Sequence, residues 1–464
     1  MIKIVINNNL IRISGHANYD DYGKDIVCAS VSSIIITSIN AIYRFNKDAI
    51  EFVDNNDVME ITKLSEDSNV EKLLDNMIYM LDELSKDYPK NIKLYRNEGY
   101  YMSTAKMVFH GSDIEKICEV YQLKPEEIVK FGANVNPLGL SEHVKEQLAG
   151  RLDILSSYPD RDYTSLRSTI SEYCNIPAEF ILPGNGSSEL IALLIQERNP
   201  KHTFILGPTY SEYSRELSFS GSTQEYYHLR EEDNFVLNVD DLCHTLDGKY
   251  DFLILCNPNN PTSSAISIND LRRIVSFCNE RNIFVMIDET YVEFAPDINE
   301  ITAVSLTREF TNLMILRGVS KFYAAPGMRL GYGITGNLEF LKKMKEKQVP
   351  WSLNSLGALA GELMLKDKNY IRQTRDLILS ERTRLLKALE NISTYKTYPA
   401  YANFLLLKIQ KPGLTSRDVF DACIRQGLMI RDCSSFECLD GEYIRFCIMH
   451  PQDNTRLLHI LTSL

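Results

Sequence analysis

The chain has 464 residues, of which 44% are hydrophobic and 24% are charged, and its formal net charge is -12. The length fits two to four globular domains, and an acidic chain has no general electrostatic attraction for nucleic acid. The sequence has no run of 18 or more apolar residues, so we predict no membrane span. The ten cysteines lack paired or metal-ligand spacing, so we expect free thiols and no metal. Together these features predict a cytoplasmic location.

Residues 1–98 show the pattern of a small α+β domain. MIKIVINNNLIRIS predicts two strands around an Asn-rich turn, residues 28–45 predict a buried helix, and residues 49–62 predict a second hairpin. SNVEKLLDNMIYMLDELSKDY has apolar residues at helical spacing after a Ser/Asn cap, and NIKLYR predicts a last strand. Residues 99–109 break this pattern, so we place a junction there and a second region at 110–464.

Two residues of this first domain are candidates for nucleophilic chemistry. His16 follows a predicted strand, and Cys28 stands at the predicted start of the apolar helix, where the helix dipole favours a thiolate. His16 would act as the base for that thiol. On spacing alone, a buried structural cysteine is the commoner explanation of Cys28.

Residues 1–97 as a whole resemble the ribosomal-processing cysteine protease family called Prp. The resemblance rests on the GHA loop, on GKDIVCA and on the long second helix that runs into NIKLY. It implies a dyad of His16 and Cys28, a mobile loop over residues 17–24, and a substrate that is the N-terminal extension of a large-subunit ribosomal protein. The alternative is a non-catalytic ribosome-binding module in which Cys28 is structural.

From residue 110 onward, short apolar runs alternate with helical stretches. The runs lie at residues 180–184, 203–208, 252–258, 283–289 and 313–318. Because they are apolar on both faces, they predict buried strands of a mostly parallel sheet, which binds ligands beyond its carboxyl ends. We expect a large domain at about residues 135–360, and a smaller α+β domain built from residues 110–134 and 361–464.

Several polar residues after these runs match the needs of pyridoxal phosphate. Lys321 follows the last run and can attach to the aldehyde, and Asp288 ends the preceding run and can keep the pyridine nitrogen protonated. Asn260, in CNPNNPT, can donate to the ring hydroxyl. Tyr291, in DETY, lies within reach of the same ring, and Tyr210, in GPTYSEY, can stack on its face.

A cradle for the cofactor phosphate is also predicted. Ser187 and Ser188 stand in GNGSSEL at the start of a predicted helix, where backbone N–H groups and hydroxyls bind anions. Ser320 and Arg329 can complete the cradle, the arginine through its planar fork of donors. Each of these signals is weak alone, since a Gly/Ser loop before a helix is usually only a cap and a turn. The ordered set carries the prediction.

This ordered set resembles the aspartate aminotransferase superfamily of fold type I, over essentially all of the chain beyond residue 108. Three stretches are most similar to the threonine-phosphate decarboxylases within the histidinol-phosphate aminotransferase group: HGSDI with FGANVNPLG, SSYPDRDYTSLR, and GLMIRDCSSFECLDGEYIRFCI. The resemblance implies an α/β large domain with a small α+β domain, and a homodimer in which Tyr158 reaches the cofactor phosphate of the partner subunit.

The same resemblance implies a small phosphorylated amino acid as substrate. Arg445 would grip the α-carboxylate, Arg431 and His110 are candidates for the substrate phosphate, and Asn134 and Asn136 would line the pocket. We therefore predict decarboxylation of O-phospho-L-threonine or phosphoserine, of the kind used for the cobalamin side chain. Histidinol-phosphate transamination is the alternative reaction, and a surface salt bridge is the alternative role of Arg431.

Two positions depart from the family pattern. Ser263 replaces the usual glycine after Asn-Pro-Thr, and the opening glycine pair is Gly111-Ser112. Neither change removes a predicted catalytic group.

Overall fold

The structure is a computed structural model, and it describes residues 1–6, 10–17, 19–20, 25–55, 58–65, 67–96, 114–246 and 248–464. The chain divides into two compact units, Met1–Val108 and Phe109–Leu464, and each is described by itself. The predicted loop at residues 17–24 lies largely outside the described residues, and His110, Gly111 and Ser112 lie outside them entirely.

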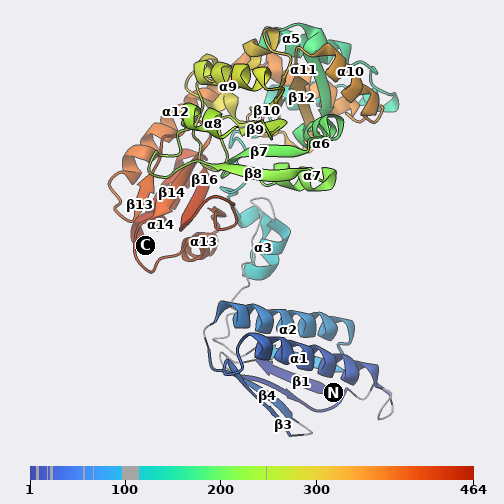
Figure 1. Cartoon of the computed structure of the whole chain (residues 1–464), viewed down its shortest axis with the longest axis vertical. Helices are drawn as coiled ribbons and strands as arrows, with labels where there is room; N and C mark the ends of the chain where they lie inside the picture. Colours follow the sequence, from blue (N-terminus) through green and yellow to red (C-terminus); the bar gives the residue numbers. More distant parts are fainter. Residues whose placement is uncertain are drawn as a thin grey trace. The chain divides into compact units, whose positions relative to one another are not determined.

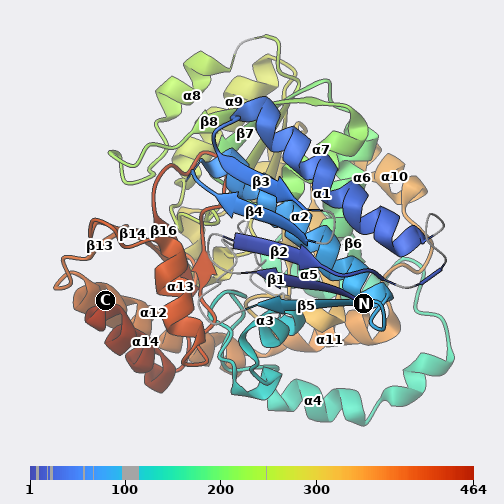
Figure 2. The same cartoon turned by 90° about the horizontal axis from the view of Figure 1, so that it is seen from below.

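The first unit has a five-stranded sheet and two long helices. Both helices lie on one face of the sheet (Figures 1 and 2). Its elements are β1 (Ile2–Ile6), β2 (Leu10–Ser14), α1 (Ile26–Phe45), β3 (Ile50–Asp54), β4 (Val58–Lys63), α2 (Ser68–Asp87) and β5 (Ile92–Arg96). The strand order is β3-β4-β2-β1-β5, with β5 parallel to β1 and the other pairs antiparallel. Every predicted helix and strand of this unit is confirmed, whereas the predicted Asn-rich turn lies outside the described residues. The N-cap of α2 is Asp67, whose side chain accepts from Asn69 N–H, one residue before the predicted Ser/Asn start.

The core of the first unit lies between the sheet and the helices. Ile4 and Ile6 of β1 are fully buried, as are Ile35 and Ile42 of α1, because alternate strand residues and one helical face point inward. By length and composition alone, α1 is apolar enough to cross a membrane, with a mean hydropathy of 1.8 over its best window. In the structure, one face of α1 packs into the core of this unit instead.

The large lobe of the second unit is a seven-stranded sheet of order β6-β12-β11-β10-β9-β7-β8. Its strands are β6 (Ile181–Asn185), β7 (His202–Gly207), β8 (Thr223–His228), β9 (Phe252–Cys256), β10 (Phe284–Asp288), β11 (Leu313–Gly318) and β12 (Leu330–Ile334). Only β12 runs antiparallel to its neighbours, which confirms the mostly parallel sheet. The five apolar runs are strands as predicted, whereas β8 and β12 were not foreseen.

Helices surround this sheet (Figure 1). They are α4 (Glu142–Ala149), α5 (Thr164–Cys174), α6 (Ser187–Arg198), α7 (Glu212–Ser220), α8 (Val239–Thr245), α9 (Ile268–Glu280), α10 (Leu338–Lys347) and α11 (Ser355–Lys366). Leu190 and Leu194 of α6 and Leu217 of α7 are fully buried in the same cluster as sheet residues. This layering leaves the carboxyl ends of β9, β10 and β11 as a common edge for a site.

The small lobe is a four-stranded antiparallel sheet of order β13-β14-β16-β15 with helices around it. Its elements are α3 (Ile114–Tyr121), α12 (Lys368–Leu389), β13 (Tyr395–Thr397), β14 (Phe404–Ile409), α13 (Ser416–Ile424), β15 (Arg431–Asp432), β16 (Tyr443–Cys447) and α14 (Pro451–Ser463). The segment after α3 joins this lobe through a bridge between Val129 and Leu428. All ten cysteines are free thiols.

Candidate functional site

Asp288 and Lys321 stand at the carboxyl ends of the neighbouring strands β10 and β11. The buried Asp288 carboxylate accepts from the Tyr213 hydroxyl over 2.7 Å through Oδ2 and from Thr290 N–H over 2.9 Å through Oδ1. These donors hold the carboxylate in one orientation. The Asp288 side chain therefore has a fixed place where it can face a protonated ring nitrogen.

The amine of Lys321 is held in a site that favours its neutral form. Its Nζ donates to Ala133 O over 2.7 Å. Burial, together with the positive charge of Arg445, lowers the pKa of Lys321 to about 8. A lysine with such a pKa has a usable fraction of neutral amine near neutral pH, which attack on an aldehyde requires.

Four predicted residues meet beside this amine. Arg445 donates to Asn260 Oδ1 through Nη1 and to Gly132 O over 2.8 Å through Nη2. Tyr291 accepts from Asn134 Nδ2 over 3.3 Å, and burial raises the pKa of its hydroxyl. Arg445 Nε and Asn134 Oδ1 are buried without a partner among the described residues. Unpaired buried polar atoms are costly, so this group is built to receive a polar ligand.

The predicted phosphate cradle assembles around the start of α6. Ser187 is the first residue of the helix and Ser188 the second, after Gly186 at φ +83°. A Cβ on Gly186 would lie 2.6 Å from Arg329 Nη2, so only glycine lets the arginine approach the turn. Helix N–H groups, two hydroxyls and a guanidinium form an anion site of the kind that fits the phosphate of pyridoxal phosphate. Ser320 is half-buried between β11 and Lys321.

Two predicted aromatic residues are placed differently from each other. Tyr210 follows β7, and its ring contacts the ring of Tyr213 edge-on, with the centroids 5.6 Å apart. Because Tyr213 donates to Asp288, Tyr210 lies on the same side of the site as Asp288. Tyr158 is 79% exposed and contacts Trp351, with ring centroids 4.7 Å apart. Within the described part of one chain, Tyr158 does not join the other cofactor groups.

The two arginines predicted to bind the substrate lie opposite each other. Arg431 on β15 and Arg445 on β16 are direct partners in the antiparallel register. They are only 7% and 5% exposed. Two like charges at such a cross-strand pair repel, which favours an anionic ligand beside them.

Asn136 has a different environment from Asn134. Its Nδ2 donates to Phe322 O and Thr374 Oγ1, both over 2.8 Å, and its Oδ1 accepts from Leu138 N–H. These contacts brace the segment beside Lys321, because Asn136 N–H also donates to Lys321 O over 3.0 Å. The structure thus shows a bracing position for Asn136, and its predicted contact with substrate stays a prediction.

Sequence reasoning missed two residues that position this site. Tyr213 stands one helical turn after Tyr210, and this spacing was the available signal for a second aromatic residue. Asn403 precedes the run FLLLKI, and its Nδ2 donates to Asn134 O over 3.0 Å. Asn134 has a positive φ of 56°, so Asn403 helps to hold a backbone conformation that non-glycine residues rarely adopt.

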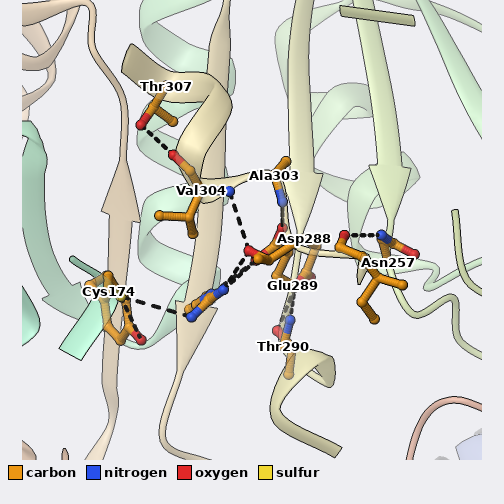
Figure 3. A network of polar contacts seen from close by, with 12 residues as sticks. Cys174, Asn257, Asp288, Glu289, Thr290, Ala303, Val304 and Thr307 are labelled. Carbon is orange, nitrogen blue, oxygen red and sulfur yellow. Dashed lines mark hydrogen bonds and ion pairs between the residues drawn. The ribbon is translucent and has the colours of Figure 1, made fainter. Parts of the chain in front are cut away.

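A buried ion pair joins β10 to β11 directly behind the site. Arg317 donates to Glu289 Oε2 from Nε and Nη2 over 3.0 and 2.8 Å. Glu289 also accepts from Ala303 N–H and from Thr302 Oγ1. Figure 3 shows the Glu289 carboxylate next to Asp288 at the end of β10. Ala303 N–H donates to Glu289, and Thr290 N–H donates to Asp288. The pair was also missed, although charges at the ends of two apolar runs were its signal.

The departure at Ser263 has a local explanation. Ser263 has φ +61°, the left-handed region where glycine is the usual residue. Its hydroxyl oxygen accepts from the N–H groups of Tyr401 and Ala402 over 3.2 and 2.9 Å. Ser263 therefore connects the loop after β9 to the segment before β14. These hydrogen bonds offset part of the backbone strain at its positive φ.

In the first unit, the GHA loop lies against the start of α1. Cys28 is the third residue of α1, and Ala17 N–H points at its Sγ over 3.1 Å. His16 is the neighbour of Ala17 and is exposed. Asn91 Nδ2 donates to Ala17 O over 3.0 Å, so the turn before β5 holds the loop from the other side. The loop is thus fixed beside a half-buried thiol.

Asp25 caps the helix that carries Cys28. Its Oδ1 accepts from the N–H groups of Val27 and Cys28, and its Oδ2 accepts from Tyr19 N–H over 2.9 Å. The Cys28 N–H is the main reason why the pKa of Asp25 is lowered from its usual range. The cap therefore connects the described part of the predicted mobile loop to the start of α1.

Comparison with known proteins relates both units to families. Residues 126–461 match the family described as aminotransferase class I and II, and residues 1–93 match the family described as cysteine protease Prp.

Individual relatives and a solved structure match the second unit. The threonine-phosphate decarboxylase of Salmonella typhimurium is 34% identical over 76% of this chain and 96% of its own length. The histidinol-phosphate aminotransferase of Methanococcus aeolicus is 31% identical over 76% of this chain and 94% of its own length. The crystal structure of the histidinol-phosphate aminotransferase from Clostridium acetobutylicum is 30% identical, has a TM-score of 0.68, and aligns with 72% of this chain and 98% of its own.

Proposed function

The chain belongs to the class I and II aminotransferase family, and from this premise we propose that its second unit decarboxylates O-phospho-L-threonine or O-phospho-L-serine. The unit is an enzyme of fold type I, and pyridoxal 5'-phosphate is its cofactor. The oriented Asp288 carboxylate, the Lys321 amine and the cradle at Ser187 fit that cofactor.

When bound, pyridoxal phosphate supplies an aldehyde that attaches to an amine and a ring that withdraws electrons from the bond being broken. Lys321 is the amine, and Asp288 holds the proton on the ring nitrogen. Ser187, Ser188 and Arg329 bind the phosphate group. In decarboxylation the bond from Cα to the carboxylate breaks, CO2 leaves, and Cα takes up one proton, for which Lys321 is the donor.

The observation that carries the choice of substrate is the buried pair Arg431 and Arg445. The two guanidinium groups lie on directly opposed residues of β15 and β16. O-Phospho-L-threonine carries a carboxylate and a phosphate on one short chain, so a single molecule offers an anion to each arginine. Histidinol phosphate carries a phosphate but no carboxylate and leaves one arginine without an anion.

The test is an assay of the holoenzyme with O-phospho-L-threonine and no keto acid. We expect release of CO2 and formation of an aminopropanol phosphate in equal amounts. O-Phospho-L-serine, which lacks one methyl group, serves as the matched second substrate. A holoenzyme that releases no CO2 from either compound would exclude the decarboxylase proposal.

The second candidate activity is transamination of histidinol phosphate. It is supported by the 31% identity to the Methanococcus aeolicus histidinol-phosphate aminotransferase, because the cofactor groups serve both reactions. In transamination the bond from Cα to hydrogen breaks, and Lys321 moves that proton. Amino transfer from histidinol phosphate to 2-oxoglutarate, without CO2 release from phosphothreonine, would assign the chain to this reaction.

For the first unit, we propose a cysteine protease that trims the N-terminal extension of a large-subunit ribosomal protein. The match of residues 1–93 to the Prp family and the placement of the GHA loop at Cys28 Sγ support this proposal. The test is cleavage of an extended ribosomal-protein peptide by the full chain and by Cys28→Ala, with Cys118→Ala in the second unit as a matched control. Cleavage that survives Cys28→Ala would leave the non-catalytic ribosome-binding module as the better explanation.

We also propose that the second unit acts as a homodimer. Tyr158 and Trp351, which are 79% and 42% exposed, have their rings in contact and form an exposed apolar surface. Leu155 and Val349, close to them in the chain, are 57% and 68% exposed. Such a surface on one subunit favours burial against another copy. Sedimentation of the holoenzyme tests this, and Tyr158→Phe tests the predicted contact with the partner's cofactor by a lower affinity for pyridoxal phosphate. A monomer at assay concentration would exclude the proposal.

A further inference from the structure

A short segment, residues 433–441, lies between β15 and β16 and contacts the Arg431 side chain. Within it, Ser435 Oγ accepts from Arg431 Nη2 over 2.7 Å. The Arg431 guanidinium also lies over the ring of Phe436, 5.5 Å from its centroid. Arg431 is buried, whereas Ser435 is exposed. The serine hydroxyl therefore stands at the solvent side of the arginine.

The 433–441 segment is attached to the large lobe as well as to the small one. A Cβ on Gly207 would lie 2.9 Å from Cys438 Sγ, so the absence of a side chain at the end of β7 lets Cys438 dock there. Cys438 Sγ also lies 3.6 Å from His228 Nε2 at the end of β8. The chain continues from this end of β7 to Tyr210, which is three residues after Gly207. Ser435 is thus placed with respect to both lobes of the site.

The hydrogen-bonding capacity of Ser435 is not exhausted by Arg431. A serine hydroxyl has one proton to donate and two lone pairs to accept with. Oγ accepts from Arg431, and no acceptor for its own proton lies among the described residues. An anion bound to Arg431 Nη2 would be within reach of that proton. A phosphate has three terminal oxygens and can accept from a guanidinium and a hydroxyl together, whereas a carboxylate has only two oxygens.

We infer that Ser435 is a specificity-determining residue that donates to the substrate phosphate and keeps Arg431 directed at it. This inference rests on the proposed function, in which Arg431 binds the phosphate of the substrate. It names a phosphomonoester as the group recognised at this end of the site. Arg445 remains the residue for the carboxylate.

The experiment measures ligand binding to the holoenzyme by calorimetry, with O-phosphoethanolamine as the probe. This compound carries the phosphate but no carboxylate, so it reports on the phosphate end alone. We expect Ser435→Ala to weaken its binding about tenfold or more, the effect of losing a hydrogen bond to a charged group. Ser434→Ala is the matched control, because the Ser434 side chain has no hydrogen-bond partner among the described residues, and its backbone N–H donates to Asp432 Oδ1. Ser435→Thr keeps the hydroxyl and should restore binding.

A kinetic measurement separates this role from a structural one. With O-phospho-L-threonine, Ser435→Ala should raise KM about tenfold and leave kcat within about twofold, because the lost contact is made equally in the bound substrate and in the transition state. The affinity for pyridoxal phosphate should not change. Equal probe affinity in the wild type and in Ser435→Ala, or no probe binding by the wild type, would overturn the inference. Absence of CO2 release by a wild type that binds the probe would instead overturn the proposed decarboxylation alone.

Discussion

The hydroxyl of Tyr213 donates to Asp288 Oδ2 over 2.7 Å, from the first turns of α7 to the end of β10. Both side chains are buried. The Asp288 carboxylate, which we propose faces the cofactor nitrogen, is therefore oriented from outside the strand that carries it. Orientation of a charged group in advance lowers the cost of binding its partner.

Tyr213→Phe removes this donor without opening a large cavity. We expect the affinity for pyridoxal phosphate to fall about tenfold or more, because a hydrogen bond to a charged group is lost. Equilibrium dialysis of the cofactor measures the effect. Tyr250→Phe is the control, since Tyr250 donates to Glu225 at the edge of the sheet. Equal cofactor affinity in the wild type and Tyr213→Phe would show that Asp288 is oriented without Tyr213.

Removal of Arg317 is expected to destabilise the second unit strongly. Arg317→Met leaves the buried carboxylate of Glu289 unpaired, which costs about 3–5 kcal/mol of the free energy of unfolding. The double variant Glu289→Gln/Arg317→Met should recover part of this loss, because no buried charge remains. Arg272→Met is the control: its ion pair with Glu309 is exposed and contributes about 1 kcal/mol or less. Denaturant unfolding gives the free energy of unfolding of the wild type and of the three variants. Equal losses in Arg317→Met and Arg272→Met would contradict the argument.

The capture of pyridoxal phosphate by the cofactor-free chain should depend on pH through Lys321. Its pKa is lowered to about 8 by burial and by Arg445, so the amine is protonated below pH 8 and neutral above it. Since only the neutral amine attacks the aldehyde, the rate of capture should rise with pH, with a midpoint near 8.

Arg445→Gln tests the cause of this pKa. Loss of the positive charge removes the second contribution to the lowered pKa, so the midpoint should move to higher pH. Stopped-flow absorbance of the cofactor gives the midpoint for both chains. A midpoint that does not move would leave burial and the charge of Arg329 as the causes of the lowered pKa. Because the folded chain holds this proton less tightly than the unfolded chain, the stability of the cofactor-free unit should also rise with pH above 8.

Much of this architecture follows from local patterns. Strands with apolar residues on both faces predict a covered parallel sheet, and the carboxyl ends of such strands converge. That argument alone placed Asp288 and Lys321 at one edge. It failed for β12, LGYGI, because its glycines do not form an apolar run. Those glycines are needed by packing: a Cβ on Gly331 would clash with the backbone at Ser187, and one on Gly333 with Met314.

The parts that escaped prediction depend on which distant segments pair. The opposition of Arg431 and Arg445 follows from the register of β15 on β16, which the fourteen-residue spacing does not reveal. The bond from Tyr213 to Asp288 joins residues 75 positions apart in the chain. Local sequence shows the residue types and the strand ends, but not such register and crossing contacts.

Ser263 allows strain and hydrogen bonding to be weighed against each other. Ser263→Ala keeps the positive φ and removes the hydroxyl acceptor of Ala402 N–H, so we expect a loss of about 1–3 kcal/mol. Tyr401 N–H keeps its bond to the carbonyl oxygen of residue 263 over 2.8 Å. Ser263→Gly loses the same acceptor but relieves left-handed strain of about 1–2 kcal/mol. The glycine variant should therefore be the more stable of the two, as thermal unfolding would show. The reverse order would mean that the backbone at residue 263 is not strained.

The GHA loop of the first unit offers a prediction that leaves the nucleophile untouched. Asn91→Ala removes the hydrogen bond from the Asn91 side chain to Ala17 O and so releases the loop from the turn before β5. We expect cleavage of an extended ribosomal-protein peptide to slow about tenfold, the effect of losing roughly 1.4 kcal/mol of positioning, while the activity of the second unit stays the same. Asn69→Ala on the exposed side of α2 is the matched control. Thermal unfolding of both variants separates loss of position from loss of fold: an Asn91 variant that cleaves at the wild-type rate would show that the loop is held by Ala17 N–H and Cys28 Sγ alone.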